Sequence, residues 1–151
     1  MYDMGVKDRA ALAVPVYAAH ASRMAHDSPR LRILVVEDDL PLLQAVERAF
    51  QEAGEDVVCA ATFEDARAAL RTESFDALLT DVRLGAFNGL QLAVIARDLH
   101  PDIRLIVYSG FNDPVLRAEA ERVGATYLVK PIASSELLER IRRPATADEK
   151  K

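Results

Sequence analysis

From Leu31 onward, short runs of apolar residues alternate with longer stretches in which apolar residues recur at helical spacing. This alternation is typical of an α/β chain whose strands form a parallel sheet. The runs are rich in Ile, Leu, Val and Ala, as in strands that helices cover on both faces. The pattern predicts five strands, at Arg32–Val36, Asp56–Ala60, Ala77–Thr80, Arg104–Tyr108 and Thr126–Val129.

The stretches between these runs have the spacing of amphipathic helices. They predict five helices, at Pro41–Ala53, Phe63–Arg71, Leu90–His100, Pro114–Val123 and Ser135–Arg142. Asp39 and Thr62 suit helix N-caps, and Gly54 and Gly124 suit helix C-terminal positions. With right-handed crossovers, the βα repeats predict an open, doubly wound sheet whose ligand site lies beyond the carboxyl ends of the strands.

Both ends of the chain differ from this regular region. Residues 1–30 are polar, then alanine-rich, then polar again, and we expect a short extension, partly helical from about Lys7 to Val14, or sequence upstream of the true start. Ala19-His20-Ala21 has the form of a signal-peptide cleavage site. The residues before Ala10 carry no net positive charge, however, which disfavours a secretory signal. Residues 144–151 suggest a polar tail, which leaves 31–143 as the domain.

Composition excludes several classes of protein. No apolar run approaches the roughly 18 to 20 residues of a membrane span. Cys59 is the only cysteine, which excludes an intramolecular disulfide and a multi-cysteine zinc site. The three histidines lie too far apart in sequence to favour a histidine-rich metal site. The 151 residues suffice for one sizeable core, so we expect one domain.

The net charge of −5 is unevenly distributed along the chain. Residues 31–142 contain 12 Lys and Arg against 19 Asp and Glu, a net charge of −7, so the two ends together carry +2. This acidic balance gives no support to direct nucleic-acid binding, which requires a basic face. Lys130 is the only lysine of this segment, and it follows the fifth predicted strand.

Acidic residues follow two of the predicted strands. Glu37, Asp38 and Asp39 come after the first strand, and Asp81 comes after the third. In a doubly wound sheet these strand ends are neighbours, so the carboxylates converge and their mutual repulsion favours a bound cation. Oxygen ligands of this kind suit Mg²⁺. Asp39 is better explained as the cap of the following helix.

Two further strand ends bring polar groups to the same edge of the sheet. The fourth predicted strand leads into Ser109 and Gly110, which taken alone predict only a turn. The fifth leads into Lys130 and Pro131. The lysine would face the carboxylates, and the proline suits an unusual peptide geometry such as cis.

Five motifs lie in order along the central segment: Ile33-Leu34-Val35-Val36-Glu37-Asp38-Asp39, Leu78-Leu79-Thr80-Asp81-Val82-Arg83-Leu84, Asn88-Gly89-Leu90, Ile106-Val107-Tyr108-Ser109-Gly110 and Tyr127-Leu128-Val129-Lys130-Pro131. With these motifs at these separations, the chain resembles the receiver domain of two-component response regulators. The resemblance covers Arg32 to Arg142. It implies a flavodoxin-like, five-stranded parallel sheet with strand order 2-1-3-4-5 and five helices.

The resemblance also implies an acidic metal and phosphorylation site. Asp81 matches the phosphoacceptor. Glu37 and Asp38 match the acidic pair that holds Mg²⁺, together with Asp81 and the backbone carbonyl of Arg83.

Four more residues match the parts of such a site that recognise the phosphoryl group. Ser109 matches the hydroxyl that binds a phosphoryl oxygen, and Lys130 matches the lysine that pairs with the phosphoryl group. Pro131 matches the cis proline that follows this lysine. Tyr127 matches the aromatic residue whose rotamer reports the state of the site, so Ser109 and Tyr127 are the expected switch residues.

The implied function is that of a phosphoacceptor in signalling. A histidine kinase or histidine phosphotransfer protein would phosphorylate Asp81 in a Mg²⁺-dependent reaction, and the changed surface would act on a partner protein or pass the phosphate on in a relay. The expected downstream face runs from Pro114 to Arg142, on which homodimers are also common in the family. We expect a cytoplasmic protein without an output domain of its own, which contacts neither nucleic acid nor membrane. It would not be an enzyme beyond its own phosphorylation and dephosphorylation.

Three residues are expected to tune the lifetime of the phosphorylated state. Gly85 stands where many receivers have proline, and Arg83 and Phe111 flank the entrance, two residues beyond Asp81 and Ser109. The guanidinium of Arg83 also has the charge to pair with the acidic pair and compete with the metal.

Other classes of function are weighed against this one. A binding module would keep the fold but act unphosphorylated, with Arg83 in the place of the cation. A small hydrolase with an aspartate nucleophile is disfavoured, because neither Asp38 nor Asp81 begins the Asp-x-Asp pattern expected after a strand. A nucleotide-binding domain is disfavoured because the chain has no Gly-rich phosphate loop.

Overall fold

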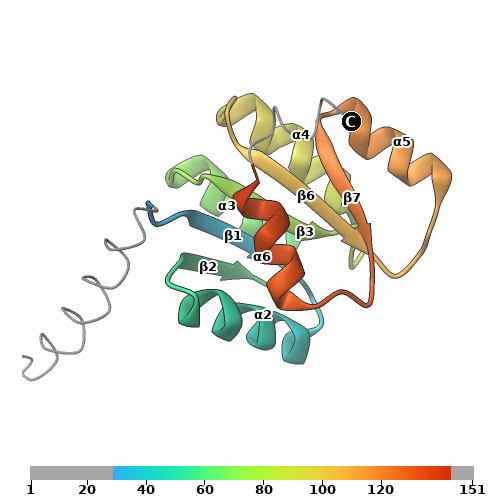
Figure 1. The fold of residues 1–151 in the computed structure, drawn as a ribbon. Helices are drawn as coiled ribbons and strands as arrows, with labels where there is room; N and C mark the ends of the chain where they lie inside the picture. The colour runs from blue at the N-terminus through green and yellow to red at the C-terminus, as the bar shows by residue number, and fades with distance from the viewer. Residues whose placement is uncertain (1–28, 144–151) are drawn as a thin grey trace, which may run out of the picture. The chain divides into compact units, whose positions relative to one another are not determined.

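The computed structural model describes residues 29–143, which fold around a five-stranded sheet (Figure 1). Strands β1 (Arg32–Val36), β2 (Asp56–Ala60), β3 (Ala77–Asp81), β6 (Arg104–Ser109) and β7 (Ala125–Val129) pair in parallel in the order β2-β1-β3-β6-β7. This is the order 2-1-3-4-5, so the predicted flavodoxin-like fold is confirmed. β3 and β6 each end one residue later than predicted, which makes Asp81 and Ser109 the last residues of their strands.

Helices cover both faces of the sheet. α3 (Phe63–Thr72), α4 (Gly89–Leu99) and α5 (Pro114–Arg122) bury apolar side chains in the core of one face. α2 (Leu40–Glu52) and α6 (Ser134–Arg142) do the same on the other face. The three central strands, β1, β3 and β6, are buried on both sides, which explains their nearly continuous aliphatic sequence.

Helix ends form where the sequence predicts them. The side chains of Asp39 and Thr62 each accept a hydrogen bond from the backbone N–H three residues further on. Gly54 and Gly124 follow helices α2 and α5 and have φ values of 97° and 83°, the left-handed conformation that glycine adopts without strain.

A short hairpin that the sequence analysis does not predict follows β3. β4 (Arg83–Leu84) and β5 (Phe87–Asn88) pair antiparallel, and two-residue strands are too short to leave a periodic pattern in a sequence. Gly85 lies in the turn with a φ of 61°, which a proline ring would forbid. The Phe87 ring stacks on Phe63 of α3, with ring centroids 4.7 Å apart. The loop after Asp81 is therefore folded and attached to α3.

Gly89, the first residue of α4, lies against the end of β3. A Cβ added at Gly89 would overlap the backbone carbonyl of Asp81. We predict that Gly89→Ala lowers the free energy of unfolding by about 1–3 kcal/mol, because the backbone must move to accept the methyl group. Urea denaturation followed by circular dichroism measures the loss. Gly110→Ala is the control, since a Cβ there would meet nothing within 4 Å, and equal losses in both variants would contradict the prediction.

The predicted N-terminal extension, apart from residues 29–30, and the predicted tail at 144–151 lie outside the described residues. The division of the chain at residues 30 and 143 therefore stays a prediction. Within residues 29–143, no helix combines the length and the apolar character that crossing a membrane demands.

Candidate functional site

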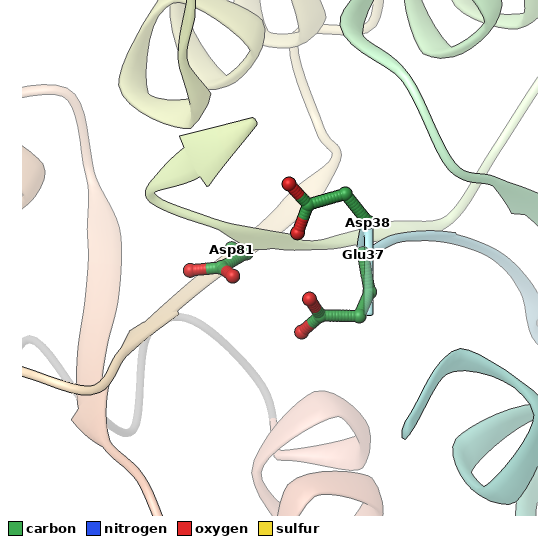
Figure 2. A group of neighbouring side chains, drawn as sticks. All are labelled: Glu37, Asp38 and Asp81. Carbon is green, nitrogen blue, oxygen red and sulfur yellow. The ribbon is translucent and has the colours of Figure 1, made fainter. Parts of the chain in front are cut away.

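Three carboxylates meet at the carboxyl ends of β1 and β3 (Figure 2). Glu37 and Asp38 directly follow β1, Asp81 ends β3, and the two strands are neighbours in the sheet. One oxygen from each side chain lies within 4.8 Å of those of the other two. Glu37 and Asp81 are buried, whereas Asp38 is exposed. The sheet topology thus brings together the acidic residues that the sequence places at separate strand ends.

Lys130 supplies a positive charge to this acidic pocket. Its Nζ donates hydrogen bonds to Glu37 Oε1 at 2.9 Å and to Asp81 Oδ2 at 3.1 Å. The same Nζ lies 4.5 Å from the centroid of the Tyr108 ring. The peptide bond between Lys130 and Pro131 is cis. One ammonium group therefore bridges the two buried carboxylates.

Burial and charge shift the protonation of these three groups in different directions. Burial alone would raise the pKa of Glu37, but hydrogen bonds from Lys130 Nζ and Asp39 N outweigh it and hold that pKa below its usual value. Burial and the charge of Glu37 raise the pKa of Asp81, and Lys130 offsets only part of this. Burial would lower the pKa of Lys130, but the two carboxylates raise it, so the lysine remains charged.

Ser109 and Tyr127 are linked through the loop that follows β6. Ser109 is fully buried, and its Oγ accepts a hydrogen bond from Phe111 N at 3.1 Å. Tyr127 is also buried, and its hydroxyl donates to the Phe111 carbonyl oxygen at 2.6 Å. Both side chains therefore bind the backbone of Phe111.

Arg83 lies outside the acidic pocket. Its guanidinium lies over the Phe111 ring, 4.3 Å from the centroid. Among residues 29–143 it forms no ion pair with Glu37 or Asp38, and the cation that contacts the pocket is Lys130. The alternative in which Arg83 takes the place of the cation is therefore wrong for this structure. An exposed aromatic face attracts the guanidinium without the desolvation that a buried carboxylate would demand.

Tyr108 belongs to the site but is not singled out by the sequence analysis. It is 1% exposed, and its hydroxyl has no hydrogen-bond partner within the part of the chain that the structure describes. Burial and the nearby charge of Glu37 raise the pKa of this hydroxyl. The available signal was a tyrosine inside an otherwise aliphatic strand, since a buried tyrosine usually needs a partner for its hydroxyl.

The donor set of the pocket fits Mg²⁺. All three side chains offer carboxylate oxygens, the hard ligands that Mg²⁺ prefers, and Asp38 keeps access to solvent. The backbone of Arg83 lies beside them, because its N–H donates to Asp81 Oδ1 at 3.4 Å. A cation there would add to the charge compensation that Lys130 now provides.

Comparisons with known proteins agree with the fold. Residues 33–142 match the response regulator receiver domain. The photosynthetic apparatus regulatory protein RegA of Cereibacter sphaeroides is 29% identical over 106 residues, which are 70% of this chain and 58% of RegA. The structure of a CheY-like receiver domain protein from Methanospirillum hungatei superposes with a TM-score of 0.74 at 29% identity, over 81% of this chain and 98% of that one.

A second solved structure also has this fold. A response regulator from Burkholderia pseudomallei, with a phosphorylated aspartic acid, a calcium ion and citrate, superposes with a TM-score of 0.72 at 26% identity, over 80% of this chain and 71% of that one. The first curated relatives are longer proteins, of which this chain spans 26% to 58%. On the match of residues 33–142 and the shared fold, the chain belongs to the response regulator receiver domain family.

Proposed function

We propose that Asp81 accepts a phosphoryl group from the phosphohistidine of a histidine kinase or a histidine phosphotransfer protein. The observation that carries this proposal is a buried aspartate at the end of β3 with an ammonium group 3.1 Å from its carboxylate and two further carboxylates around it. Membership of the receiver family supports the same role. The protein would act in the cytoplasm, and its only catalysis would be its own phosphorylation and dephosphorylation.

The transfer itself needs alignment and charge compensation more than covalent help from the protein. A carboxylate oxygen of Asp81 forms a bond to phosphorus while the bond from phosphorus to the donor imidazole nitrogen breaks, and that nitrogen keeps the electron pair. Lys130 is placed to pair with a phosphoryl oxygen. Ser109 Oγ accepts a bond from Phe111 N, so its own proton is available for another phosphoryl oxygen.

Mg²⁺ would complete the charge compensation. Glu37, Asp38, Asp81 and the backbone carbonyl of Arg83 are the groups that would hold the ion. Bound there, Mg²⁺ supplies positive charge to the phosphoryl oxygens.

The added charge would then change the surface of the protein. The aspartyl phosphate would carry roughly −2 in place of the single negative charge of the carboxylate, and it would draw Lys130 and Ser109 toward residue 81. Movement of Ser109 breaks its bond to Phe111 N and changes the contact between Phe111 and Tyr127. The affected face consists of α5, β7 and α6, and we propose that a downstream protein or a second copy of the chain binds there, rather than nucleic acid.

Acetyl phosphate with Mg²⁺, followed by intact-mass measurement, tests the proposal. We expect one phosphate adduct on the chain and none on Asp81→Asn. Asp39→Asn is the matched control and should form the adduct, since Asp39 caps α2 outside the trio of carboxylates. A chain that forms no adduct, or an adduct on Asp81→Asn, would contradict the proposed phosphoacceptor.

A binding module that acts unphosphorylated is the second candidate. The observation that favours it is that Lys130 pairs with both Glu37 and Asp81, so a side chain of the protein itself compensates the charge of these carboxylates. Titration with millimolar Mg²⁺ under amide NMR separates the two candidates. Shifts at Asp38 and Asp81 support the phosphoacceptor, whereas a spectrum unchanged by the metal supports the binding module.

Arg83→Ala is predicted to shorten the lifetime of the phosphorylated form about two- to fivefold, because loss of the contact between Arg83 and Phe111 admits water to the pocket. The substitution leaves the backbone carbonyl of residue 83 in place. Loss of the phosphate adduct after removal of the donor, followed by mass measurement, gives the lifetime. Arg71→Ala, at an exposed position of α3, is the control. An unchanged lifetime in Arg83→Ala would count against this role.

A further inference from the structure

A groove of about 1160 Å³ runs along β7, the strand at the open edge of the sheet. α4 and α5 contribute to it from one face of the sheet and α6 from the other. The three carboxylates of the acidic pocket do not line it. The groove is therefore a second feature of the surface, distinct from the phosphorylation site.

Arginine dominates the lining of this groove. Among the described residues, the lining holds six arginines against two carboxylates, a local net charge of +4, whereas residues 31–143 together carry −6. Positive charge is thus concentrated at one edge of an otherwise acidic domain. The arginines are Arg97, Arg104, Arg117, Arg122, Arg140 and Arg143.

No carboxylate among residues 29–143 pairs with the guanidinium group of Arg97, Arg104, Arg117, Arg122 or Arg140. Arg97 and Arg104 donate to the backbone carbonyls of Gly124 and Ile141, at 3.3 Å and 2.9 Å. A backbone carbonyl satisfies a hydrogen bond but does not neutralise the charge. Half-buried arginines of this kind favour the paired hydrogen bonds that a carboxylate offers.

We propose that the groove binds an acidic, extended segment of a partner protein, whose carboxylates pair with these guanidinium groups. The inference rests on the proposed signalling function, for which it names the chemistry of the partner. An extended segment suits a groove that follows a strand, and a carboxylate-rich one suits its charge.

A nucleic acid fits the groove less well. Among residues 29–143, Tyr127 is the only aromatic residue of the lining, and it is 3% exposed, so this part of the chain offers no platform for stacking bases. Asp98 and Glu121 also line the groove and would repel phosphates. The acidic charge of the surrounding domain adds to that repulsion.

Arg117 connects the groove to the phosphorylation site. Its guanidinium lies 4.9 Å from the centroid of the Tyr127 ring and donates to the Tyr127 carbonyl at 3.3 Å and to Asn112 Oδ1 at 3.2 Å. A carboxylate that draws Arg117 into the groove would weaken these contacts with the loop after Ser109. By thermodynamic linkage, phosphorylation then changes the affinity of the groove for the acidic segment. The bound segment changes the equilibrium constant of phosphorylation by the same factor.

The test is fluorescence anisotropy with a labelled peptide of alternating glutamate and glycine, on the full chain at low salt without a phosphodonor. We expect the double variant Arg122→Gln with Arg140→Gln to bind at least about tenfold more weakly. Neither side chain has a hydrogen bond or ion pair with the described residues, so folding should be preserved. The control is the double variant Arg48→Gln with Arg71→Gln, on α2 and α3. It loses the same two positive charges as the groove variant, and it should bind the peptide as tightly as the parent protein does.

Three outcomes would overturn the inference. Equal weakening in both double variants would show non-specific charge attraction. Tighter binding of an oligothymidylate of equal charge, lost in the groove variant, would assign the groove to nucleic acid. Dimers in sedimentation that the groove variant abolishes would assign it to a second copy. Peptide binding is measured without phosphorylation, so a peptide that fails to bind does not contradict the proposed phosphorylation of Asp81. In the same way, absence of the phosphate adduct does not contradict peptide binding in the groove.

Discussion

Lys130→Met is expected to slow phosphorylation of Asp81 by acetyl phosphate about 10²- to 10³-fold, the loss typical of removing one electrostatic contact to the reacting group. The variant should also lose about 3 kcal/mol of stability. The ammonium bridges Glu37 and Asp81, whose side chains are 1% and 12% exposed, and methionine leaves both carboxylates without a counter-charge. The rate of adduct formation measures the first effect, and urea denaturation measures the second.

Arg142→Met separates the two effects of this substitution. Arg142 pairs at 2.7 Å with Glu55, whose side chain is 4% exposed, but this pair does not belong to the acidic pocket. We expect Arg142→Met to lose stability while its phosphorylation rate stays that of the parent. If Arg142→Met slows phosphorylation as much as Lys130→Met does, Lys130 stabilises the fold but does not act directly in phosphorylation.

Asp81→Asn is expected to stabilise the fold at neutral pH, besides abolishing the phosphate adduct. Burial and the charge of Glu37 raise the pKa of Asp81 in the folded protein. An acid with a raised folded-state pKa binds its proton more tightly when folded, so it costs stability as the pH rises through that pKa. Asparagine removes this cost, and we expect a gain on the order of 1 kcal/mol at pH 7.

The pH dependence makes this expectation specific. Below about pH 3.9, the ordinary aspartate pKa, the carboxyl is protonated in both states and the charge penalty is absent. The stability difference between Asp81→Asn and its parent should therefore shrink from pH 7 to pH 3. Urea denaturation at both pH values measures it, with the exposed Asp102→Asn as control. A difference that persists at pH 3 would mean that packing, not charge, causes the gain.

How much of the site follows from the sequence can be seen residue by residue. Glu37, Asp81 and Lys130 follow from topology, because parallel strands deliver their carboxyl ends to one edge once their order is known. The position of Arg83 does not follow from the sequence. Whether its guanidinium contacts a carboxylate or the Phe111 ring depends on the desolvation free energy of each contact. The desolvation free energy depends on how deeply each group is buried in the folded protein, and the residues next to it in sequence do not determine this.

The fold shows the same limit. Long segments with regular spacing predict their elements, and the ends of β3 and β6, the start of β7 and the ends of the helices shift by a residue or so. The β4–β5 hairpin escapes prediction because its order comes from one positive φ at Gly85 and one ring contact across the chain, between Phe87 and Phe63.

That hairpin has a thermodynamic consequence for ligand binding. The fold itself fixes the backbone of Arg83 and Leu84 in a paired strand. Ordering a free backbone costs roughly 1–2 kcal/mol per residue in conformational entropy. Because folding already orders these two residues, ligand binding does not include this cost. Binding at the pocket should therefore show a small entropy of ordering and a small change in heat capacity, the calorimetric signature of a rigid receptor rather than of a loop that folds around its ligand.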